Sequence, residues 1–549
     1  MNIGFRNANP SHGGESYYIT IEDAFDGQRA CLLVDSGPGV RVERDLGSDE
    51  YLAGILLTHA HLDHYRTLGE NVRDGAKIHT SPSTAAIIET IYREGERNYD
   101  LSGTEAVLDA LDPIENWHEI RNDLAVHPIP AGHAPGAVGF VIRILDGSRP
   151  VYALATGDFG FERVAGYPPL PTTLPVDIDM LFVNGAVDND PTTTEIVTNA
   201  LTRARDGSTV LVTTGGLSGV EYAYLLGHAA GRVGNEIPIT IVGQIAKLYA
   251  DLEFDVPNVQ PVANFSDPSD VLESGGICLA GPEVPVDGSA KRLFGRIKDD
   301  PAATLLQIGS SNEPPVESAG CTVYSYRHTS HPSLESVDQL VDSLVPIHTV
   351  VHHGNHNRFK GRYDETFIWT DTTQIAHTLY STGNWQEPPW IDEEICTLIR
   401  ESYNRKRGSR LGDIFEESDL GLPELPTPGR ETPPDLEREG LSPGALEVVQ
   451  KPLTAAVGTE SEAEHEPADE GCEESALSET GTETERTSAE GDTERILARL
   501  DDIGVQLDDS NSVRVRVIDM GEGDILFRAL DDVEFDHGEE LCCRLSAVE

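Results

Sequence analysis

The chain has 549 residues, enough for two to four domains with a large hydrophobic core. Its 94 acidic residues against 40 basic ones give a formal net charge of −54, which at ordinary ionic strength excludes nucleic-acid binding through a broadly basic surface. No apolar run approaches the roughly 18 residues of a membrane-spanning helix, so we expect no membrane partner.

The excess of acidic residues also suggests a habitat. An acidic surface with little lysine is typical of a protein kept soluble at very high salt, and our hypothesis is a halophilic archaeal host. In molar salt long-range repulsion is screened, so only a local basic or metal-lined groove would decide nucleic-acid binding. The seven cysteines are scattered without a Cys-x-x-Cys pair, which favours neither a disulfide framework nor a zinc ribbon. The first twenty residues lack a secretory signal, so we expect a cytoplasmic protein.

Apolar and polar residues alternate over residues 17–36, which predicts paired strands at the start of a sheet. Asp35 ends the second of these strands, directly before Ser36 and Gly37. Position alone leaves two interpretations for Asp35, an ordinary turn residue or a carboxylate that supports a nearby site.

A dense cluster of metal-binding residue types follows. The apolar run Ile55–Leu57 predicts a buried strand, and it leads into His59, His61, Asp63 and His64. Residues two apart on an extended segment face the same side, so His59 and His61 can reach one ion, while Asp63 and His64 can serve a second. A polar loop that happens to be rich in histidine is the alternative. Imidazole and carboxylate ligands suit Zn²⁺, with Mn²⁺ or Fe²⁺ as other choices.

Further candidates stand at later strand ends. We predict helices over 65–70 and 82–93 around a strand at Lys77–Thr80, then strands at Leu124–Pro130 and Val151–Ala155. His133 follows the first of these two strands beside glycine, where a sharp backbone turn can present its ring to a cleft. Asp158 follows the second, and its two oxygens can bridge two metal ions.

A second α/β block separates these residues from the last histidines. Alternating strands and helices indicate a parallel sheet, with strands near 180–183, 209–213, 238–242, 276–280 and 304–308 and helices over 194–205 and 219–231. His328 and His331 come next, followed by a helix at Leu334–Leu344 and a strand at His348–Val351 that leads to His353. Candidate ligands on both sides of the block indicate one domain inserted into another.

The segment from His59 to His64 resembles the His-x-His-x-Asp-His signature of the metallo-β-lactamase superfamily. The insertion, Ser330–Leu334 and Val351–Gly354 are similar to the β-CASP branch, the nucleases related to RNase J and the cleavage-and-polyadenylation endonuclease. The resemblance covers roughly residues 15–360. It implies an α/β fold, a metallo-β-lactamase αββα sandwich with an inserted β-CASP-like α/β domain.

We expect five regions in the chain. The lactamase domain would occupy residues 1–165 and 323–414 around the insert at 166–322. Acidic and small polar residues then predict a disordered linker over 415–492. A small α+β module would close the chain at 493–549, with a helix at 493–507 and strands at 512–518, 523–528 and about 540–546. It would serve as a partner or self-association module, or equally as a plain mini-domain.

The resemblance also implies roles for these residues. Two divalent ions, Zn²⁺ in the first instance or Mn²⁺, would be held by His59, His61 and His133, by Asp63, His64 and His353, and by Asp158 between them. Asp35 would orient a ligand histidine, and His331 would assist the leaving group as a general acid. Asp63, Asp158 and His331 are thus the expected catalytic residues.

Two departures from the family pattern bear on the substrate. Asn184 stands where the family usually has a carboxylate, and Leu217–Glu221 lacks the arginine that would grip a phosphate. Asn184, Ser218 and His328 are the candidate substrate contacts.

Three hypotheses follow. The first is a ribonuclease that cleaves single-stranded RNA with a metal-activated water. The histidine at the last ligand position supports this hypothesis. The second keeps the metal site but takes a small phosphodiester, thioester or lactone, which the missing arginine and Asn184 favour. The third is a non-catalytic partner of an active nuclease, which the intact ligand set opposes.

Overall fold

The computed structural model describes residues 1–22, 27–95, 101–147, 149–188, 193–232, 237–310, 313–408, 421–425, 434–450, 515–521 and 524–529. The chain divides into two compact units, Met1–Leu453 and Thr454–Glu549, each of which is described by itself. Within the described residues no helix combines the length and the apolar composition that crossing a membrane requires.

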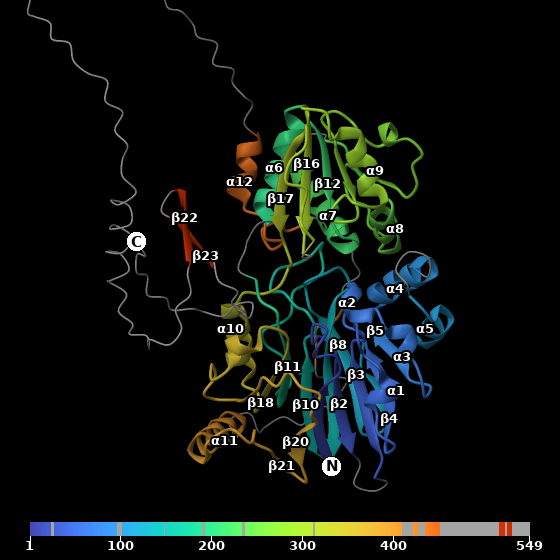
Figure 1. Cartoon of the computed structure of the whole chain (residues 1–549). Helices are drawn as coiled ribbons and strands as arrows, with labels where there is room; N and C mark the ends of the chain where they lie inside the picture. The colour runs from blue at the N-terminus through green and yellow to red at the C-terminus, as the bar shows by residue number, and fades with distance from the viewer. Residues whose placement is uncertain are drawn as a thin grey trace, which may run out of the picture. The chain divides into compact units, whose positions relative to one another are not determined.

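Two mixed sheets form the body of the first unit, the lower lobe in Figure 1. Among the described residues, the first sheet has eight strands in the order β21 (Asn384–Trp385), β20 (His377–Ser381), β1 (Asn2–Asn7), β2 (Tyr17–Glu22), β3 (Arg29–Val34), β4 (Glu50–Leu56), β5 (Lys77–Thr80) and β6 (Leu111–Pro113). The second, on the same basis, has seven in the order β19 (Phe367–Trp369), β18 (His348–Gly354), β11 (Met180–Gly185), β10 (Arg149–Ala155), β9 (Val138–Asp146), β8 (Leu124–Pro130) and β7 (His118–Arg121).

The two sheets pack face to face because their strands alternate. Met180 and Phe182 of β11 belong to the apolar core between the sheets, together with Ile19 and Leu56 of the facing sheet. Leu181 and Val183 belong to a different apolar cluster, on the helix-covered side. A strand that is apolar on both faces needs cover on both, and this requirement produces four layers.

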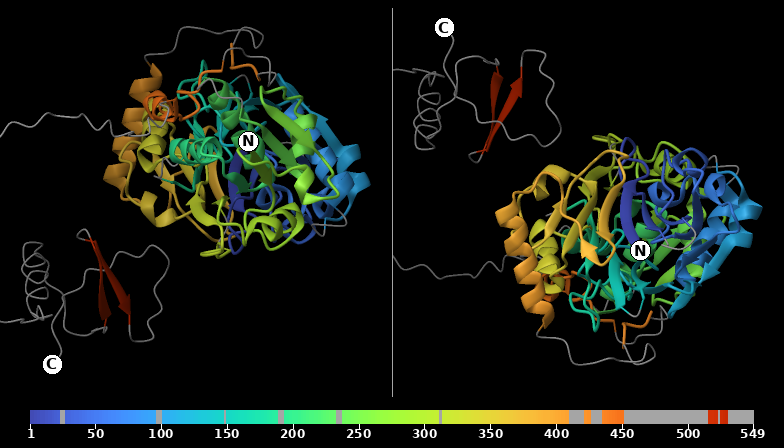
Figure 2. Two further views of the ribbon diagram at one scale, coloured as in Figure 1. Left: turned by 90° about the horizontal axis from the view of Figure 1, so that it is seen from above. Right: turned by 90° about the horizontal axis from the view of Figure 1, so that it is seen from below.

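Helices supply the outer layers, as the views from above and below show (Figure 2). One set covers the first sheet: α1 (Val42–Asp45), α2 (Leu62–Tyr65), α3 (Leu68–Asn71), α4 (Pro82–Gly95) and α5 (Thr104–Ala110). On the other side lie α10 (Leu334–Leu344) and α11 (Glu393–Gly408), with the short 3₁₀ turn η2 (His356–Phe359) after β18. The αββα sandwich expected from the sequence is confirmed.

The upper lobe is a parallel sheet with helices on both faces. Its strand order is β14 (Val259–Val262), β13 (Ile239–Val242), β15 (Ile277–Ala280), β12 (Thr209–Thr213), β16 (Ala303–Gly309) and β17 (Thr322–Arg327). Leu211 packs with α9 (Gly288–Ile297), whereas Val210 and Val212 pack on the side of the remaining helices. These are α6 (Thr193–Arg205), α7 (Gly216–Arg232) and α8 (Gln244–Asp251), and a 3₁₀ turn, η1 (Pro268–Asp270), precedes β15.

Several predicted elements have the expected bounds, including β5, β8 and α10. The prediction that the strand near 180–183 belongs to the inserted block is wrong, because β11 pairs with β10 and β18 of the sandwich. The sheet of the insertion therefore begins at β12 and continues through β17. The single helix over 65–70 is also wrong. Thr67 donates to the carbonyls of Ser36 and Gly37 and separates α2 from α3.

The segment 434–446 corrects the prediction of a disordered linker over 415–492. Leu436, Leu441 and Leu446 are buried and belong to the apolar cluster that also contains the helices of the insertion. Two hydrogen bonds hold the segment in place. The backbone N–H of Arg163 donates to the carbonyl of Arg438, and the hydroxyl of Thr194 donates to the carbonyl of Gly440. The helix α12 (Pro443–Gln450) then packs on α6. Three leucines are enough to order the segment because the two lobes provide an apolar surface on which they are buried. The composition of the segment alone does not reveal this surface.

The buried carboxylates at this junction should make the free energy of unfolding depend on pH. Burial, Glu439 and Glu162 raise the pKa of Glu221 from 4.5 to about 8, and burial raises that of Glu439 to about 7 although Arg163 opposes the shift. A carboxyl whose pKa is higher in the folded chain loses its stabilising contribution as the pH rises from about 4.5 to about 8. Glu221→Gln should therefore match the parent near pH 4.5 and exceed its free energy of unfolding by about 4 kcal/mol at pH 8.5.

Denaturant unfolding at both pH values measures this effect. Glu273→Gln is the matched control, because Glu273 is exposed on the same lobe and its replacement should change nothing. A Glu221→Gln variant that gains no stability between the two pH values would contradict the prediction.

In the second unit, the described residues form one antiparallel hairpin of β22 (Val515–Gly521) and β23 (Asp524–Ala529). This hairpin confirms the two strands predicted near 512–518 and 523–528. The expected helix at 493–507 and the strand near 540–546 lie outside the described residues.

Candidate metal centre

The predicted ligands stand at strand ends that meet at one edge of the sandwich. Asp35 and the residues from His59 to His64 follow β3 and β4 of the first sheet. His133 and Asp158 follow β8 and β10 of the other sheet, and His353 lies near the end of its β18. Strands β8, β10, β11 and β18 run in the same direction, so their carboxyl ends lie at the same edge. Residues that are up to about three hundred positions apart in the sequence therefore converge.

Three histidines form the first ligand group. His61 Nδ1 lies 3.0 Å from His59 Nε2 and 3.1 Å from His133 Nε2. The three rings are nearly perpendicular to one another, and their ligand atoms lie within 4.8 Å. Three imidazole nitrogens that face one another at these distances are ligands that a divalent ion can bind.

The second group gathers around Asp158. Its Oδ2 lies 3.5 Å from His64 Nε2 and 3.5 Å from His133 Nε2, and its Oδ1 lies 3.7 Å from His353 Nδ1. Asp158 thus contacts both groups, the place predicted for a bridging carboxylate. Asp63 is half exposed and reaches the cluster from its rim, 3.9 Å from His64 Nε2.

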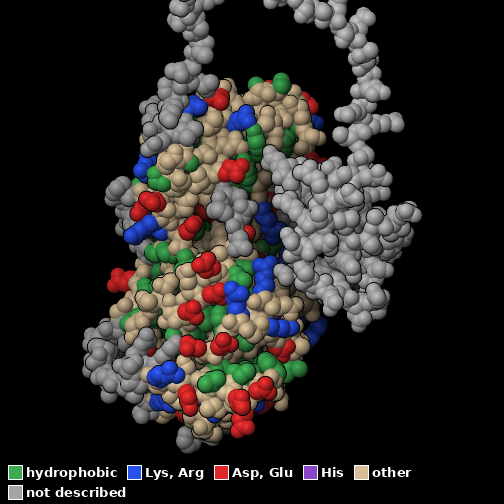
Figure 3. All heavy atoms as spheres, turned by 90° about the vertical axis from the view of Figure 1, so that its left-hand side faces the viewer, with side chains coloured by type: hydrophobic (Ala, Val, Ile, Leu, Met, Phe, Trp, Pro, Cys, Tyr) green, Lys and Arg blue, Asp and Glu red, His purple; other side chains and the backbone are tan. Residues whose placement is uncertain are grey.

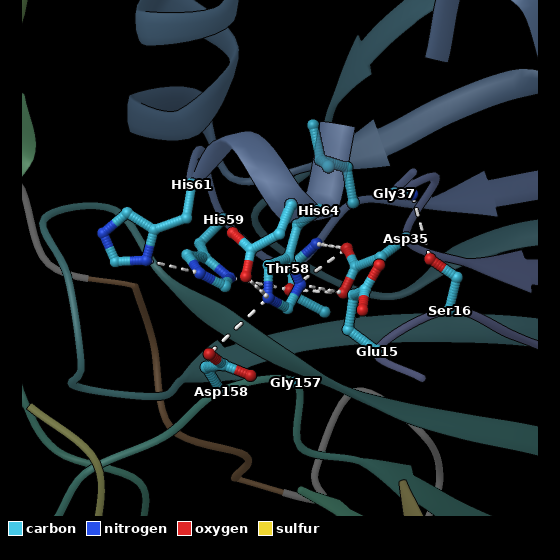
Figure 4. A network of polar contacts seen from close by, with 12 residues as sticks. Glu15, Ser16, Asp35, Gly37, Thr58, His59, His61, His64, Gly157 and Asp158 are labelled. Atoms are coloured by element: carbon cyan, nitrogen blue, oxygen red, sulfur yellow. Dashed lines mark hydrogen bonds and ion pairs between the residues drawn. The ribbon is translucent and has the colours of Figure 1, made fainter. Parts of the chain in front are cut away.

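Asp35 lies behind the histidines (Figure 4). Its Oδ2 is 2.8 Å from His64 Nδ1, and its Oδ1 accepts the backbone N–H of Thr58 at 2.8 Å. The Thr58 hydroxyl joins Asp35 to His59 Nδ1 at 3.0 Å, so one buried carboxylate orients two imidazoles. This contact turns the Nε2 atoms of both rings toward the centre of the cluster. Gly157 permits the close packing, because a Cβ there would lie 2.6 Å from Thr58 Cβ.

The electrostatics of the cluster suit a cation. Burial, reinforced by His64, holds the pKa of His59 well below its usual value, and burial likewise lowers the pKa of His133, which leaves neutral rings with free lone pairs. Burial also acts to lower the pKa of His64, but Asp158 and Asp35 raise it well above its usual value. Burial would raise the pKa of the Asp158 carboxyl, yet His64 and its other neighbours hold it far below the usual value.

Three residues of the site have a strained backbone. Asp35, His133 and His353 have φ values of 56°, 57° and 57°, in the left-handed region that non-glycine residues rarely adopt. Each such residue costs about 1–3 kcal/mol, a cost that the surrounding packing must offset. The strained backbone directs three side chains into one small volume.

His331 and Asn184 complete the surroundings of Asp158. His331 Nε2 lies 3.0 Å from Asp158 Oδ2, and its ring stacks on that of His133 with centroids 5.0 Å apart. The Asn184 amide donates to Asp158 Oδ1 and accepts the backbone N–H of Ala186. Asn184 thus faces a predicted ligand, and a carboxylate in its place could not donate this bond.

Two candidate substrate contacts lie elsewhere. Both ring nitrogens of His328 are engaged, with the Thr193 hydroxyl and with that of Tyr222, each at 3.1 Å. These bonds favour a structural role for His328. Ser218 lies in the first turn of α7, and within the described residues no hydrogen bond or ion pair joins it to the cluster.

Sequence reasoning missed Glu15. This buried carboxylate lines the same small cavity as His64, Asp158, Asn184 and His353, and it accepts a hydrogen bond from Asn9. Burial raises its pKa to about 7 against the opposing effect of His64. No motif identifies Glu15, because it stands alone in a loop before β2.

The residues fit a pair of divalent ions. Among the described residues, His64 Nε2 and His353 Nδ1 are buried and make no hydrogen bond, although both face the cluster. Leaving a buried polar atom unpaired costs about 1–3 kcal/mol, which a bound cation would remove. Five imidazoles and two carboxylates are a borderline donor set that suits Zn²⁺ or Mn²⁺ rather than Ca²⁺.

Replacement of Asp35 tests the support of these ligands. Asp35→Asn should weaken metal affinity by about 10- to 100-fold, because the amide cannot hold both imidazoles in their observed orientation. Competition with a chromogenic chelator measures the affinity. Asp74→Asn is the matched control, since Asp74 has a φ of 58° like the 56° of Asp35 but lies away from the cluster. Equal affinity in the two variants would contradict the assigned role.

Comparison with known proteins agrees with this geometry. Residues 31–191 match the family described as the β-lactamase superfamily domain. The ribonuclease TTHA0252 of Thermus thermophilus is 28% identical over 294 residues, which cover 46% of this chain and 66% of that protein. The chain therefore spans just under two thirds of the length of this curated relative.

Similar solved structures include a protein of unknown function from Enterococcus faecalis V583, with 14% identity and a TM-score of 0.45 over 64% of this chain and 94% of that one. Another is MEM-A1, a subclass B3 metallo-β-lactamase from a soil metagenome library, with 19% identity and a TM-score of 0.19 over 31% of this chain and 77% of that one.

The fold and the His/Asp cluster define a protein of the metallo-β-lactamase fold. The match to the β-lactamase superfamily domain covers residues 31–191 of the chain.

Proposed function

We propose that the chain is a metal-dependent hydrolase of the β-CASP type that cleaves phosphodiester bonds of single-stranded RNA. The observation that carries the proposal is the convergence of five histidines and two carboxylates with His331 at one edge of the sandwich. The inserted lobe stands above that edge in Figure 1, and the resemblance to RNA-processing nucleases and the ribonuclease relative support RNA as the substrate.

His59, His61 and His133 would hold one ion, and Asp63, His64 and His353 the other, with Asp158 shared between them. Two bound divalent ions would supply a nucleophilic water at neutral pH and offset the charge that develops on the phosphate. Asn184 holds the Asp158 carboxylate through its amide, and Asp35 and Thr58 hold the histidine rings. The chain therefore presents an oriented site before any substrate arrives.

His331 is the proton donor in this proposal. Its ring is partly exposed, unlike the buried rings of His59 and His64, so it can reach a substrate oxygen. Stacking on His133 fixes the plane of the ring, and Nε2 faces Asp158. A proton at Nε2 would pass to the leaving oxygen as the P–O bond breaks.

A small phosphodiester, thioester or lactone is the second candidate substrate. The missing arginine near Ser218 favours it, because an arginine there would bind a phosphate, and Asn184 departs from the carboxylate of the family pattern. The face shown in Figure 3 carries interspersed acidic and basic side chains rather than a continuous basic surface. A non-catalytic partner role would follow only if no substrate class were turned over.

A substrate panel distinguishes the candidates. End-labelled single-stranded RNA, the matching DNA, a p-nitrophenyl phosphodiester, a thioester and a lactone would be assayed in parallel at high KCl with Zn²⁺ or Mn²⁺. We expect RNA to have the highest kcat/KM, and its product ladder separates endonucleolytic from exonucleolytic attack. A thioester or lactone preferred over RNA would overturn the proposal, and no turnover at all would favour the non-catalytic role.

A further inference from the structure

A second cluster of ligand-type side chains lies away from the centre described above. His79 stands on β5, Asp112 on β6 and His118 at the start of β7. Asp112 Oδ2 lies 3.1 Å from His79 Nδ1 and 3.5 Å from His118 Nε2. One ligand atom from each residue lies within 4.8 Å of the other two.

Burial distinguishes this cluster from a surface ion pair. The His79 side chain is only 3% exposed, and its buried Nδ1 points at Asp112 Oδ2. Asp112 and His118 are 35% and 37% exposed, so solvent and ions can reach the open side.

The distances fit one small ion. In a tetrahedral zinc site with bonds of about 2.0–2.1 Å, neighbouring ligand atoms lie about 3.3 Å apart. The two measured separations from Asp112 Oδ2, 3.1 Å and 3.5 Å, bracket that value. Two imidazoles and one carboxylate are the donors of a borderline transition-metal ion, whereas Ca²⁺ and Mg²⁺ prefer oxygen.

We propose that His79, Asp112 and His118 form a separate mononuclear site for a divalent transition-metal ion of the Zn²⁺ class. The three side chains supply three ligands, and the exposed side leaves a fourth position for water. This site shares no residue with the centre formed by His59 to His353.

The position of the site indicates a structural role. Strand β6 is the last strand of the first sheet and β7 the last strand of the second, so the cluster lies where the sandwich is open. His79 pairs in register with Leu56, whose side chain belongs to the core between the sheets, so His79 faces the same side. A bound ion would therefore join the edges of the two sheets and stabilise the folded chain in proportion to its occupancy.

Metal content of the full chain tests the site. The protein, the His118→Ala variant and the Asp112→Asn variant would be loaded with Zn²⁺, desalted and analysed for metal per chain. We expect each variant to hold one ion fewer than the parent. His228→Ala is the matched control, since His228 is a partly buried histidine on α7 outside both clusters, and it should hold the parental amount.

Two further measurements keep the test decisive. RNA cleavage and far-UV circular dichroism should be unchanged in His118→Ala and Asp112→Asn, so that a lost ion reports this site rather than unfolding. Co²⁺ loading should give d–d absorption that is smaller in both variants than in the control. Equal metal content in the parent and both folded variants would overturn the proposal and leave the cluster as an ion-pair network only.

Discussion

Asp158→Ala is expected to lower kcat/KM for RNA cleavage on the order of 10³-fold or more. Asp158 contacts members of both ligand groups, through His133 on one side and through His64 and His353 on the other. Its removal leaves the histidines without their shared counter-charge, so we also expect the variant to hold fewer ions per chain than the parent. Initial rates on end-labelled RNA and metal analysis of the same sample measure the two effects together.

Asp299→Ala is the control for this experiment, because Asp299 is an exposed aspartate of the inserted lobe. It should keep parental activity and metal content. If Asp158→Ala cleaved RNA within tenfold of the parent, the cluster would not be the catalytic centre. If its activity were lost while metal content stayed at the parental value, Asp158 would act on the substrate rather than as a ligand.

His331→Ala should lower kcat by about 10²- to 10³-fold at unchanged metal content, because the leaving oxygen would depart without a proton. The deficit should shrink to less than about tenfold on a p-nitrophenyl phosphodiester, whose leaving group needs little protonation. His331→Gln can still donate a hydrogen bond to Asp158 Oδ2 but cannot transfer a proton. We therefore expect it to be as slow as His331→Ala.

The pair of variants separates two roles for His331. Recovery of activity in His331→Gln would show that the residue positions Asp158 and does not donate the proton. A deficit of equal size on RNA and on the p-nitrophenyl substrate would contradict general-acid assistance. His228→Ala again provides a histidine control outside both clusters.

The convergence of the candidate ligands was predictable because the sequence places them at or just after the ends of apolar strands. His59, His61 and His64 follow β4, and Asp158 follows β10, so the strand directions bring them to one edge. The helix α10 was equally predictable, since Ser333 accepts the backbone N–H of Ser336 and an apolar stripe follows.

Other features depend on contacts that a single sequence does not reveal. The apolar sequence of β11 is compatible with a place in the sandwich or in the inserted sheet. Its pairing with β18 shows that it belongs to the sandwich. Glu15 joins the cavity through its loop and Asn9, without a motif. The segment 434–446 is polar apart from three leucines, and its order depends on the surface that the two lobes provide.

Cleavage of end-labelled single-stranded RNA by stripped and reloaded protein tests the central claim most directly. The chain would be freed of metal by chelation, assayed at high KCl, and assayed again after addition of about two equivalents of Zn²⁺ or Mn²⁺. The account predicts no cleavage by the stripped protein and full recovery on reloading, with none in Asp158→Ala. Cleavage that persists without metal, or a reloaded protein that leaves RNA intact, would contradict it.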